Sequence, residues 1–430
     1  MKQHKYFFVG AIGAIIAAVT LAGCAGAPQS SGDSNPSGAG TLTVVSIPNY
    51  KGSLPSAVTA FEKENPAIKV NLQFVDVNSM YTTIRTQLTA GTAPDVFTVF
   101  PGNGTPTAME VLVPNGYLAD LSGLALDKRI PQGMDSVTKV DGKRYVLPLS
   151  LGAIGGIYND GALTALGVTA PKTWSEVLQL CGTAKAAGKV AYSYGAQTAW
   201  NNQLISFALT ASLVHGKDKN FDKNQTAGKA SFVNSAWKIA LEKLLQMNTA
   251  GCFQSTPLGT SYENATALVA KGDALGMVSV SSTFAAITTA APKDATFSFH
   301  ALPATDNPEE TWIPAGASGA FGINAKAKNL AAAKKFLDFL ATDATMADIA
   351  KAQGTLPAIT SSLYETPVSV KEILTFVAAN KTHPYNDQLW PSPKVAQTLM
   401  EQVQQLIGGQ TSVTAALTAM DTVYAEGSGS

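Results

Sequence analysis

The alternation of apolar and polar segments after residue 41 predicts strands and helices in strict succession. The expected order is strand, helix, strand, helix, strand, over residues 42–47, 54–64, 69–75, 81–91 and 96–100. Residues 69–75 alternate as a half-buried strand does, whereas 96–100 is a continuous apolar run that is typical of a fully buried one. Strands and helices that alternate at this spacing indicate an α/β fold with a parallel sheet and right-handed crossovers.

The loops that follow these strands are the first candidate ligand site. Parallel sheets bind ligands beyond the carboxyl ends of their strands. Asn49 and Tyr50 come directly after the first strand, and Phe100 and Asn103 end and follow the third. We therefore expect these four side chains to face a ligand.

The second half of the chain continues the pattern with further strands and helices. A helix is expected to begin at Thr173, which with Glu176 forms a capping box, and a second capping box is expected at Thr260 and Glu263. Other expected elements are strands over 190–195 and 274–280 and helices over 232–247, 329–342, 395–407 and 413–424.

Two glycine-rich segments interrupt this order. Asp141-Gly142 is a two-residue hairpin signal, and the strand after it runs into Gly152, Gly155 and Gly156. Residues 312–323 form a second glycine-rich strand. Glycine lets a backbone bend or approach another segment closely, so we interpret both segments as crossings between two lobes, with a third near Leu363 to Pro367.

Several motifs on these segments resemble one protein family. They are D-G-K-R-Y-V-L-P at 141–148, L-G-V-T-A-P-K-T-W-S-E-V at 166–177, L-T-A-G-T-A-P-D-V-F at 88–97 and G-A-S-G-A-F-G-I-N-A-K-A-K-N at 316–329. This pattern resembles the extracellular solute-binding proteins of bacterial ABC importers, in their carbohydrate-binding, maltose-binding-protein-like family 1. The resemblance covers residues 41 to 425.

The resemblance implies a two-lobed periplasmic-binding-protein-like fold of type II, in which each lobe is a mainly parallel sheet flanked by helices. The expected lobes are 41–149 with 319–365 and 150–318 with 366–430. It further implies a monomer without enzyme activity or cofactor that captures a neutral mono- or oligosaccharide in the interlobe cleft. The sugar would pass to the transmembrane permease subunits of an ABC importer.

The amino terminus is predicted to be an export signal. Residues 1–23 combine a basic start with a short apolar stretch, and Leu21-Ala-Gly-Cys24 resembles a bacterial lipobox. We expect cleavage before Cys24, lipid on its thiol, and a flexible tether over 24–40. The protein is then extracytoplasmic and held at the cell membrane by lipid alone; a plain signal peptide is the alternative.

The charge and cysteine content of the chain limit which ligands it can bind and in which cellular compartment it works. The chain has 30 basic and 30 acidic residues, which excludes the basic face that nucleic acid requires. Its three arginines, Arg85, Arg129 and Arg144, lie far apart, and this scarcity favours a neutral ligand over phosphate or carboxylate. Outside the cell, Cys181 and Cys252 can persist as a disulfide, which we favour over two buried thiols.

A neutral sugar needs aromatic platforms for its C–H faces and polar groups of both kinds for its hydroxyls. Trp200 and Trp390 are the favoured platforms, with Phe284 and Trp312 as further aromatic candidates, whereas Trp174 and Trp237 fall in core helix patterns. The complete predicted site is Asn49, Tyr50, Phe100, Asn103, Gln197, Trp200, Asn201, Ser281, Ser282, Gly316, Ser318 and Trp390.

Three alternatives remain open from the sequence. The same fold could bind another solute, such as an anion, a small molecule or a metal; iron-binding relatives use clustered tyrosines, and Tyr192 and Tyr194 share a strand face. The protein could serve a chemoreceptor. A secreted glycosidase would need two paired carboxylates, and no catalytic motif points to an enzyme or to a metal site.

Overall fold

The computed structural model describes residues 39–428, which fall within one compact unit of the chain. The predicted signal peptide, the lipidation site Cys24 and all but the end of the predicted tether lie outside the described residues. Among the helices within this range, none has both the length and the apolarity to cross a membrane.

The first lobe is built on a five-stranded sheet of order β2-β1-β3-β12-β6. β1 pairs in parallel with β2 and β3, and β12 joins β3 and β6 antiparallel. The predicted β-α-β-α-β succession is therefore confirmed. The strands are β1 (Gly40–Ser46), β2 (Ile68–Phe74), β3 (Val96–Val99), β6 (Val146–Pro148) and β12 (Ala320–Ile323).

Local sequence signals define the helices of this lobe. Asp76 caps α2 by accepting from the backbone N–H groups of Asn78 and Ser79, and Gly91 ends it at φ 71°. Phe61 of α1 packs edge-on against Phe336 of α12 at 5.0 Å. The helices are α1 (Leu54–Glu64), α2 (Val77–Ala90), α3 (Met109–Leu112), α4 (Asp135–Thr138), α12 (Leu330–Leu340) and α13 (Asp343–Gln353).

The predicted hairpin turn separates the short strands β4 (Lys139–Val140) and β5 (Lys143–Arg144). Its two central residues, Asp141 and Gly142, have φ of 49° and 76°. Two positive φ values in succession are what a two-residue hairpin loop requires, so the Asp-Gly signal is confirmed.

The second lobe surrounds a seven-stranded sheet whose central strand is β7 (Ser150–Asn159). β7 pairs antiparallel with β9, β10, β11 and β13, so this sheet is mixed rather than mainly parallel as expected. The partners and outer strands are β8 (Val190–Tyr192), β9 (Ala274–Val280), β10 (Phe297–His300), β11 (Ile313–Ala317), β13 (Leu356–Pro357) and β14 (Thr382–His383).

The glycines of β7 serve close packing rather than bending. A Cβ added at Gly155 would lie 2.6 Å from the Phe299 ring, and one added at Gly156 would lie 2.6 Å from the Tyr158 hydroxyl. Real Cβ contacts do not come this close, so both positions admit only a bare backbone. The glycine run predicted as a flexible crossing is instead an unbroken strand.

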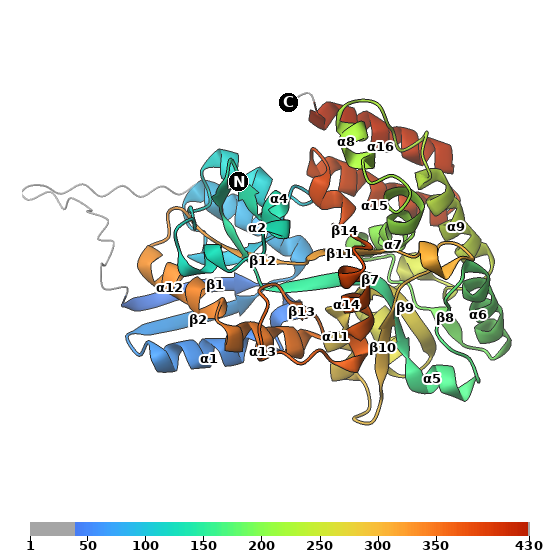
Figure 1. The fold of residues 1–430 in the computed structure, drawn as a ribbon, viewed down its shortest axis with the longest axis horizontal. Coiled ribbons are helices and arrows are strands. Elements are labelled where there is room, and N and C mark those ends of the chain that lie inside the picture. Colours follow the sequence, from blue (N-terminus) through green and yellow to red (C-terminus); the bar gives the residue numbers. More distant parts are fainter. Residues whose placement is uncertain (1–38, 429–430) are drawn as a thin grey trace, which may run out of the picture. The chain divides into compact units, whose positions relative to one another are not determined.

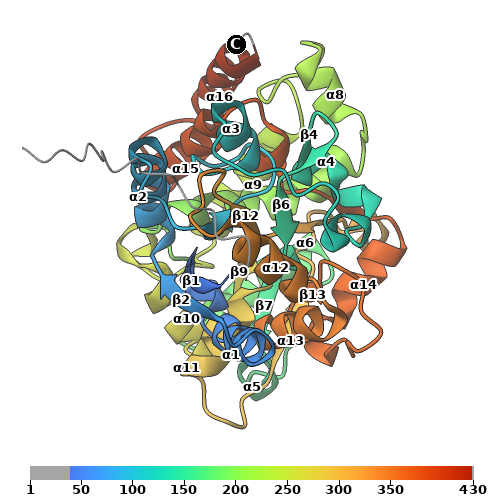
Figure 2. The ribbon, with the colours of Figure 1, turned by 90° about the vertical axis from the view of Figure 1, so that its left-hand side faces the viewer.

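Helices cover the second sheet, and α15 and α16 pack on each other and against α9 (Figure 2). The Thr173–Glu176 capping box at α6 is confirmed. At α10 the cap is Ser261 rather than Thr260, and α9 begins at Trp237 because residues 232–236 form a turn. The helices are α5 (Asp160–Ala165), α6 (Trp174–Ala186), α7 (Leu204–Thr210), α8 (Phe221–Thr226), α9 (Trp237–Thr249), α10 (Tyr262–Ala270), α11 (Thr283–Ala290), α14 (Lys371–Ala378), α15 (Pro393–Ile407) and α16 (Val413–Ser428).

The chain passes between the sheets at short connections (Figure 1). β6 ends one residue before β7 begins, and two residues separate β11 from β12. The return expected near Leu363 to Pro367 stays a prediction. Ile359 still packs in the core of the first lobe, whereas Tyr364 and Val370 pack in a core of the second lobe. The exact lobe boundaries along the sequence remain a prediction.

Candidate functional site

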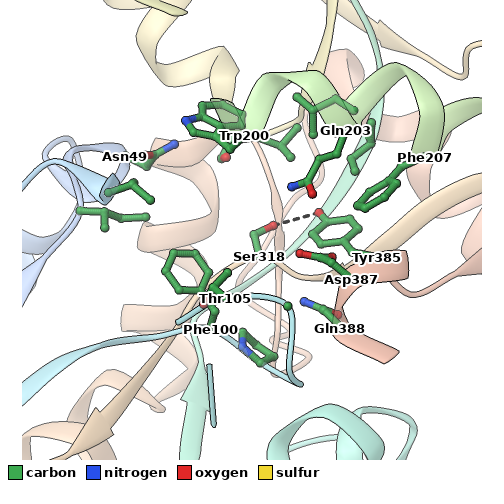
Figure 3. A pocket seen from close by; sticks show the side chains of 18 of the residues that line it. Asn49, Phe100, Thr105, Trp200, Gln203, Phe207, Ser318, Tyr385, Asp387 and Gln388 are labelled. Carbon is green, nitrogen blue, oxygen red and sulfur yellow. Dashed lines mark hydrogen bonds between the residues drawn. The ribbon is translucent and has the colours of Figure 1, made fainter. Parts of the chain in front are cut away.

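A cavity of about 130 Å³ lies where the loops of the two sheets meet (Figure 3). The first lobe contributes the segment after β1, the start of α2 and the loop after β3. The second contributes the turn that leads into α7 and the segment after β14. The polar and aromatic lining residues are Asn49, Tyr50, Tyr81, Phe100, Thr105, Trp200, Gln203, Phe207, Ser282, Ser318, Gln353, Tyr385, Asp387 and Gln388.

Aromatic rings from both lobes line the cavity. Phe100 meets Tyr81 edge-on with ring centroids 5.6 Å apart, on the first lobe. On the second lobe, Trp200 is half-buried and packs against Tyr262 at 5.0 Å. The packing fixes these rings before a ligand arrives, so they present preformed apolar surfaces.

A polar network links three remote segments at the centre of the site. Ser318 and the Tyr385 hydroxyl are 3.1 Å apart, the contact drawn in Figure 3. Gln388 donates from Nε2 to the Ala317 carbonyl at 2.8 Å. A Cβ at Gly152 would overlap the Ser318 hydroxyl and lie 2.9 Å from the Tyr385 hydroxyl, so a glycine in β7 makes room for this pair.

Several oxygen atoms of the lining are buried without a hydrogen-bond partner among the described residues. They are Thr105 Oγ1, Gln203 Oε1, Gln353 Oε1, Asp387 Oδ1 and Gln388 Oε1. A buried polar group without a partner costs free energy. The site is therefore suited to a molecule that donates several hydrogen bonds.

Asp387 is the one carboxylic acid among the lining residues, and Lys, Arg and His do not occur among them. Burial raises the pKa of the Asp387 carboxyl to about 7, although backbone hydrogen bonds oppose the shift. The Asp387 carboxyl group therefore changes between its protonated and its ionised form near neutral pH.

The lobes contact each other directly beside this acid. Asn103 donates from its backbone N–H to the Gln388 carbonyl at 3.2 Å, and its Nδ2 donates to the Pro391 carbonyl at 2.8 Å. A Cβ at Gly104 would lie 2.6 Å from the Asp387 Cγ. The bare backbone of Gly104 lets the loop after β3 lie flat against the segment after β14.

The structure brings together half of the residues predicted from the sequence. Asn49, Tyr50, Phe100, Trp200, Ser282 and Ser318 all line the cavity. They come from five separate stretches of the chain, which the two sheets assemble at one place.

The other six predicted residues are engaged elsewhere. Asn103 bonds across the lobe contact, Asn201 donates to the Gly195 carbonyl, and Ser281 accepts from the Ala153 N–H. Gln197 is exposed outside the cavity lining, and Gly316 pairs with Gly152 inside the sheet.

Trp390 is the largest correction. Its side chain is only 3% exposed and packs at 5.7 Å against Phe207 and at 5.9 Å against Trp237. It belongs to the core of the second lobe, as Trp174 and Trp237 do, so its predicted role as a platform is wrong. Of the further aromatic candidates, Phe284 is also buried, and Trp312 lies outside the cavity lining.

Sequence reasoning missed a group of lining residues that includes Tyr81, Gln203, Phe207, Tyr385, Asp387 and Gln388. One signal was present: positions 200, 203, 204 and 207 follow the i, i+3, i+4, i+7 spacing of one helix face. Figure 3 shows Gln203 pointing from that face toward Ser318 and Tyr385.

Tyr192 and Tyr194, the pair considered for an iron site, do not point into the cavity. Tyr192 meets the Tyr158 hydroxyl at 3.0 Å, and Tyr194 donates to Asn202 Oδ1 at 2.8 Å. Both side chains are buried in the core of the second lobe, away from the cavity lining.

His215, Asp222 and His383 form a cluster whose potential ligand atoms lie within 4.8 Å of one another. The two imidazoles stack at 3.5 Å with only 12° between their planes. Nitrogen lone pairs lie in the ring plane, so two parallel rings cannot both aim at one ion. His383 Nδ1 also lies 2.7 Å from the Pro384 carbonyl, and its Nε2 lies 2.9 Å from Asp222. The cluster is a hydrogen-bonded brace rather than a metal site.

This brace makes stability depend on pH. Burial, with His383 close by, lowers the pKa of His215 to about 3. The unfolded chain takes up that proton below about pH 6.5, so the folded state loses stability as pH falls from 6.5 toward 3. We expect a loss of about 2 kcal/mol between pH 6.5 and 5 from this residue. Urea unfolding at pH 6.5 and at pH 5 should show this difference in unfolding free energy in the wild type and in His300→Gln. The difference should be much smaller in His215→Gln. An unchanged difference in His215→Gln would contradict the assignment.

The protein consists of two sheet-based lobes whose loops enclose a cavity. This is the architecture of the two-lobed binding proteins. The model of the bacterial extracellular solute-binding protein family matches residues 47–347, and the chain belongs to that family.

Individual relatives agree with this assignment. The "Multiple sugar-binding protein" of Streptococcus mutans is 25% identical over 338 residues, which span 77% of each chain. The "Melibiose/raffinose/stachyose-binding protein MelE" of Bacillus subtilis is 23% identical over 283 residues, or 63% of this chain and 64% of MelE. The solved structure of the binding protein RafE with raffinose has a TM-score of 0.75 at 22% identity and covers 90% of this chain and 99% of RafE. That structural likeness shows a shared fold.

Proposed function

We propose that the protein binds a neutral sugar, an oligosaccharide in particular, in the cavity between its lobes. The observation that carries this proposal is the composition of the lining, where aromatic rings on both lobes surround a set of unpartnered hydrogen-bond acceptors. A sugar matches both features, because its C–H faces stack on rings and its hydroxyls donate hydrogen bonds.

The charge of the site supports an uncharged ligand. Arg144 is buried and pairs with Asp127 and Asp135, and Arg129 pairs with Asp343, so neither is directed at the cavity. Phosphate and carboxylate ligands are usually held by guanidinium groups or lysines, which the lining does not contain. The sugars named for the relatives, which include raffinose and stachyose, fit the same chemistry.

The proposed contacts follow from the lining. Trp200 and Phe100 stack on sugar rings from opposite lobes, and Asn49, Ser282 and Ser318 bond to hydroxyls. A ligand that touches both lobes in the closed form stabilises that form, so binding and closing are coupled.

The biological setting is the second part of the proposal. The lipobox-like sequence at Leu21–Cys24 supports a lipid-anchored, extracytoplasmic protein, and the family supports delivery of the sugar to the permease of an ABC importer. Radiolabelled palmitate incorporated by the wild type and lost in Cys24→Ala would test the anchor.

A thermal-shift screen over mono- and oligosaccharides tests the binding function. A sugar at one hundred times its Kd adds about 2.7 kcal/mol to the stability of the folded protein. Trp200→Ala should weaken binding of the selected sugar by about 2 kcal/mol, roughly 30-fold in Kd, because a buried aromatic platform is lost.

Trp312→Ala is the matched control, since Trp312 lies outside the lining and packs under Lys219. Titration calorimetry should give this variant the wild-type Kd. Equal losses in the two variants, or stabilisation by phosphate but by no sugar, would refute the proposal. A glycosidase needs two paired carboxylates, and Asp387 is the one carboxylic acid among the lining residues. Release of reducing ends from oligosaccharides would therefore contradict the binding proposal.

A further inference from the structure

The Asp387 carboxylate lies at the contact between the two lobes. It follows β14 in the second lobe, where the neighbouring Asn386 donates to Thr210 at 2.9 Å and fixes the segment. One side of the carboxylate packs on Gly104 of the first lobe. Asp387 is a lining residue of the cavity, and its buried Oδ1 atom has no hydrogen-bond partner among the described residues. Figure 3 shows the carboxylate below Tyr385, on the cavity wall next to Gln388.

Within the described range of the chain, the residues that line the cavity with this acid include no lysine, arginine or histidine. The other ionisable groups of the cavity lining are the tyrosines, of which Tyr81 and Tyr385 interact with Asp387 electrostatically. His383 lies four residues earlier in the chain but pairs with Asp222. Asp76, the N-cap of α2, also interacts electrostatically with Tyr81 and adds further negative charge on the side of the first lobe.

Lobe contact is what buries the acid. The loop that contains Gly104 belongs to the first lobe, so separating the lobes removes it from the carboxylate and admits water. A carboxylate that leaves water without a compensating partner costs several kcal/mol.

We propose that Asp387 makes closure of the lobes conditional on a bound ligand, because an empty closed cavity leaves its buried Oδ1 atom without a hydrogen-bond partner among the described residues, whereas a ligand hydroxyl bonded to Oδ1 supplies one. This inference rests on the proposed sugar-binding function and assigns Asp387 the role of sensing occupancy. Asp387 thereby selects ligands that present a hydrogen-bond donor at this point of the cavity.

The same geometry predicts that pH controls closure of the ligand-free protein. Burial raises the pKa of Asp387 from its usual 3.8 to about 7, so the closed form holds the proton more tightly than the open form. Closure is then most favoured at low pH, becomes less favourable as the pH rises toward 7, and changes little above it.

Small-angle scattering on the ligand-free mature protein at pH 5 and pH 8 tests the inference. The wild type should be more compact at pH 5 than at pH 8. Asp387→Asn, which keeps the shape but carries no charge, should be compact at both. Asp294→Asn is the matched control, since it neutralises an exposed acid between α11 and β10 and should behave as the wild type does. Circular dichroism confirms that each variant is folded.

Equal radii of gyration for the wild type and Asp387→Asn at both pH values would overturn the inference, as would a wild-type radius that does not change with pH. A parallel series with raffinose separates the two proposals. If neither raffinose nor any other sugar of the thermal-shift screen compacts the wild type, while Asp387→Asn is compact without ligand, the sensing role stands and the sugar assignment fails.

Discussion

Gly104→Ala is expected to weaken ligand binding at least 100-fold. The new methyl group would lie 2.6 Å from the Asp387 Cγ and 2.7 Å from its Cβ, so it meets the other lobe at the point where the two come together. The φ of Gly104 is not in the left-handed region, so alanine fits the local backbone and the variant should fold normally. If the lobes cannot close, the ligand loses every contact that one lobe would make. A 100-fold increase in Kd corresponds to about 2.7 kcal/mol of binding free energy.

Titration calorimetry with the sugar found in the screen measures this loss, and scattering shows whether the lobes stay apart. Gly133→Ala is the matched control, because a Cβ there meets nothing within 4 Å. Wild-type affinity in Gly104→Ala would mean that the lobes do not need this contact to hold a ligand.

Removing the Cys181–Cys252 disulfide is expected to cost about 4 kcal/mol of unfolding free energy. The structure joins these two cysteines, the pairing that the sequence favoured, across 71 positions of sequence. Cross-linking a loop of this length restricts the unfolded chain by about this amount in the loop-entropy estimate. The bond ties α6 to the residues after α9, two helices of the second lobe.

Urea unfolding of Cys181→Ala/Cys252→Ala should show the loss as a lower midpoint. Adding a reductant to the wild type should reproduce it, whereas the double variant should not respond to the reductant. A double variant as stable as the wild type would show that packing around the two buried positions holds this part of the lobe without the cross-link.

The elements of the first lobe could be predicted because their signals are local. The alternation in β2, the Asp76 cap and the Gly91 end of α2 each act within a few residues, and each is found where the pattern indicates. The role of the glycines in β7 was harder to predict. They allow close contact with Phe299 and with the side chain of Tyr158 in the same strand. A glycine that avoids an overlap and one that permits a bend look the same in sequence.

The site was half predictable for a similar reason. Residues at strand ends, such as Asn49 and Phe100, could be found because topology alone brings them to the cavity. Around Trp390 the sequence shows which segment approaches the ligand but not which side chains of that segment face it. Asp387 and Gln388 turn toward the cavity, while Trp390 turns back among Phe207, Phe232 and Trp237. The direction of the Trp390 side chain depends on the space that the other core residues leave for it, and that space exists only in the folded lobe.

The two ends of the described chain belong to different lobes. β1 begins at Gly40 in the first sheet, whereas α16 packs against α9 and ends beside Pro391 and Ser392 in the second lobe. A point of attachment ahead of residue 40 is therefore linked to the first lobe. If ligand binding closes the lobes, as proposed, a fluorophore on the last helix would move relative to the first lobe and would report the bound ligand optically.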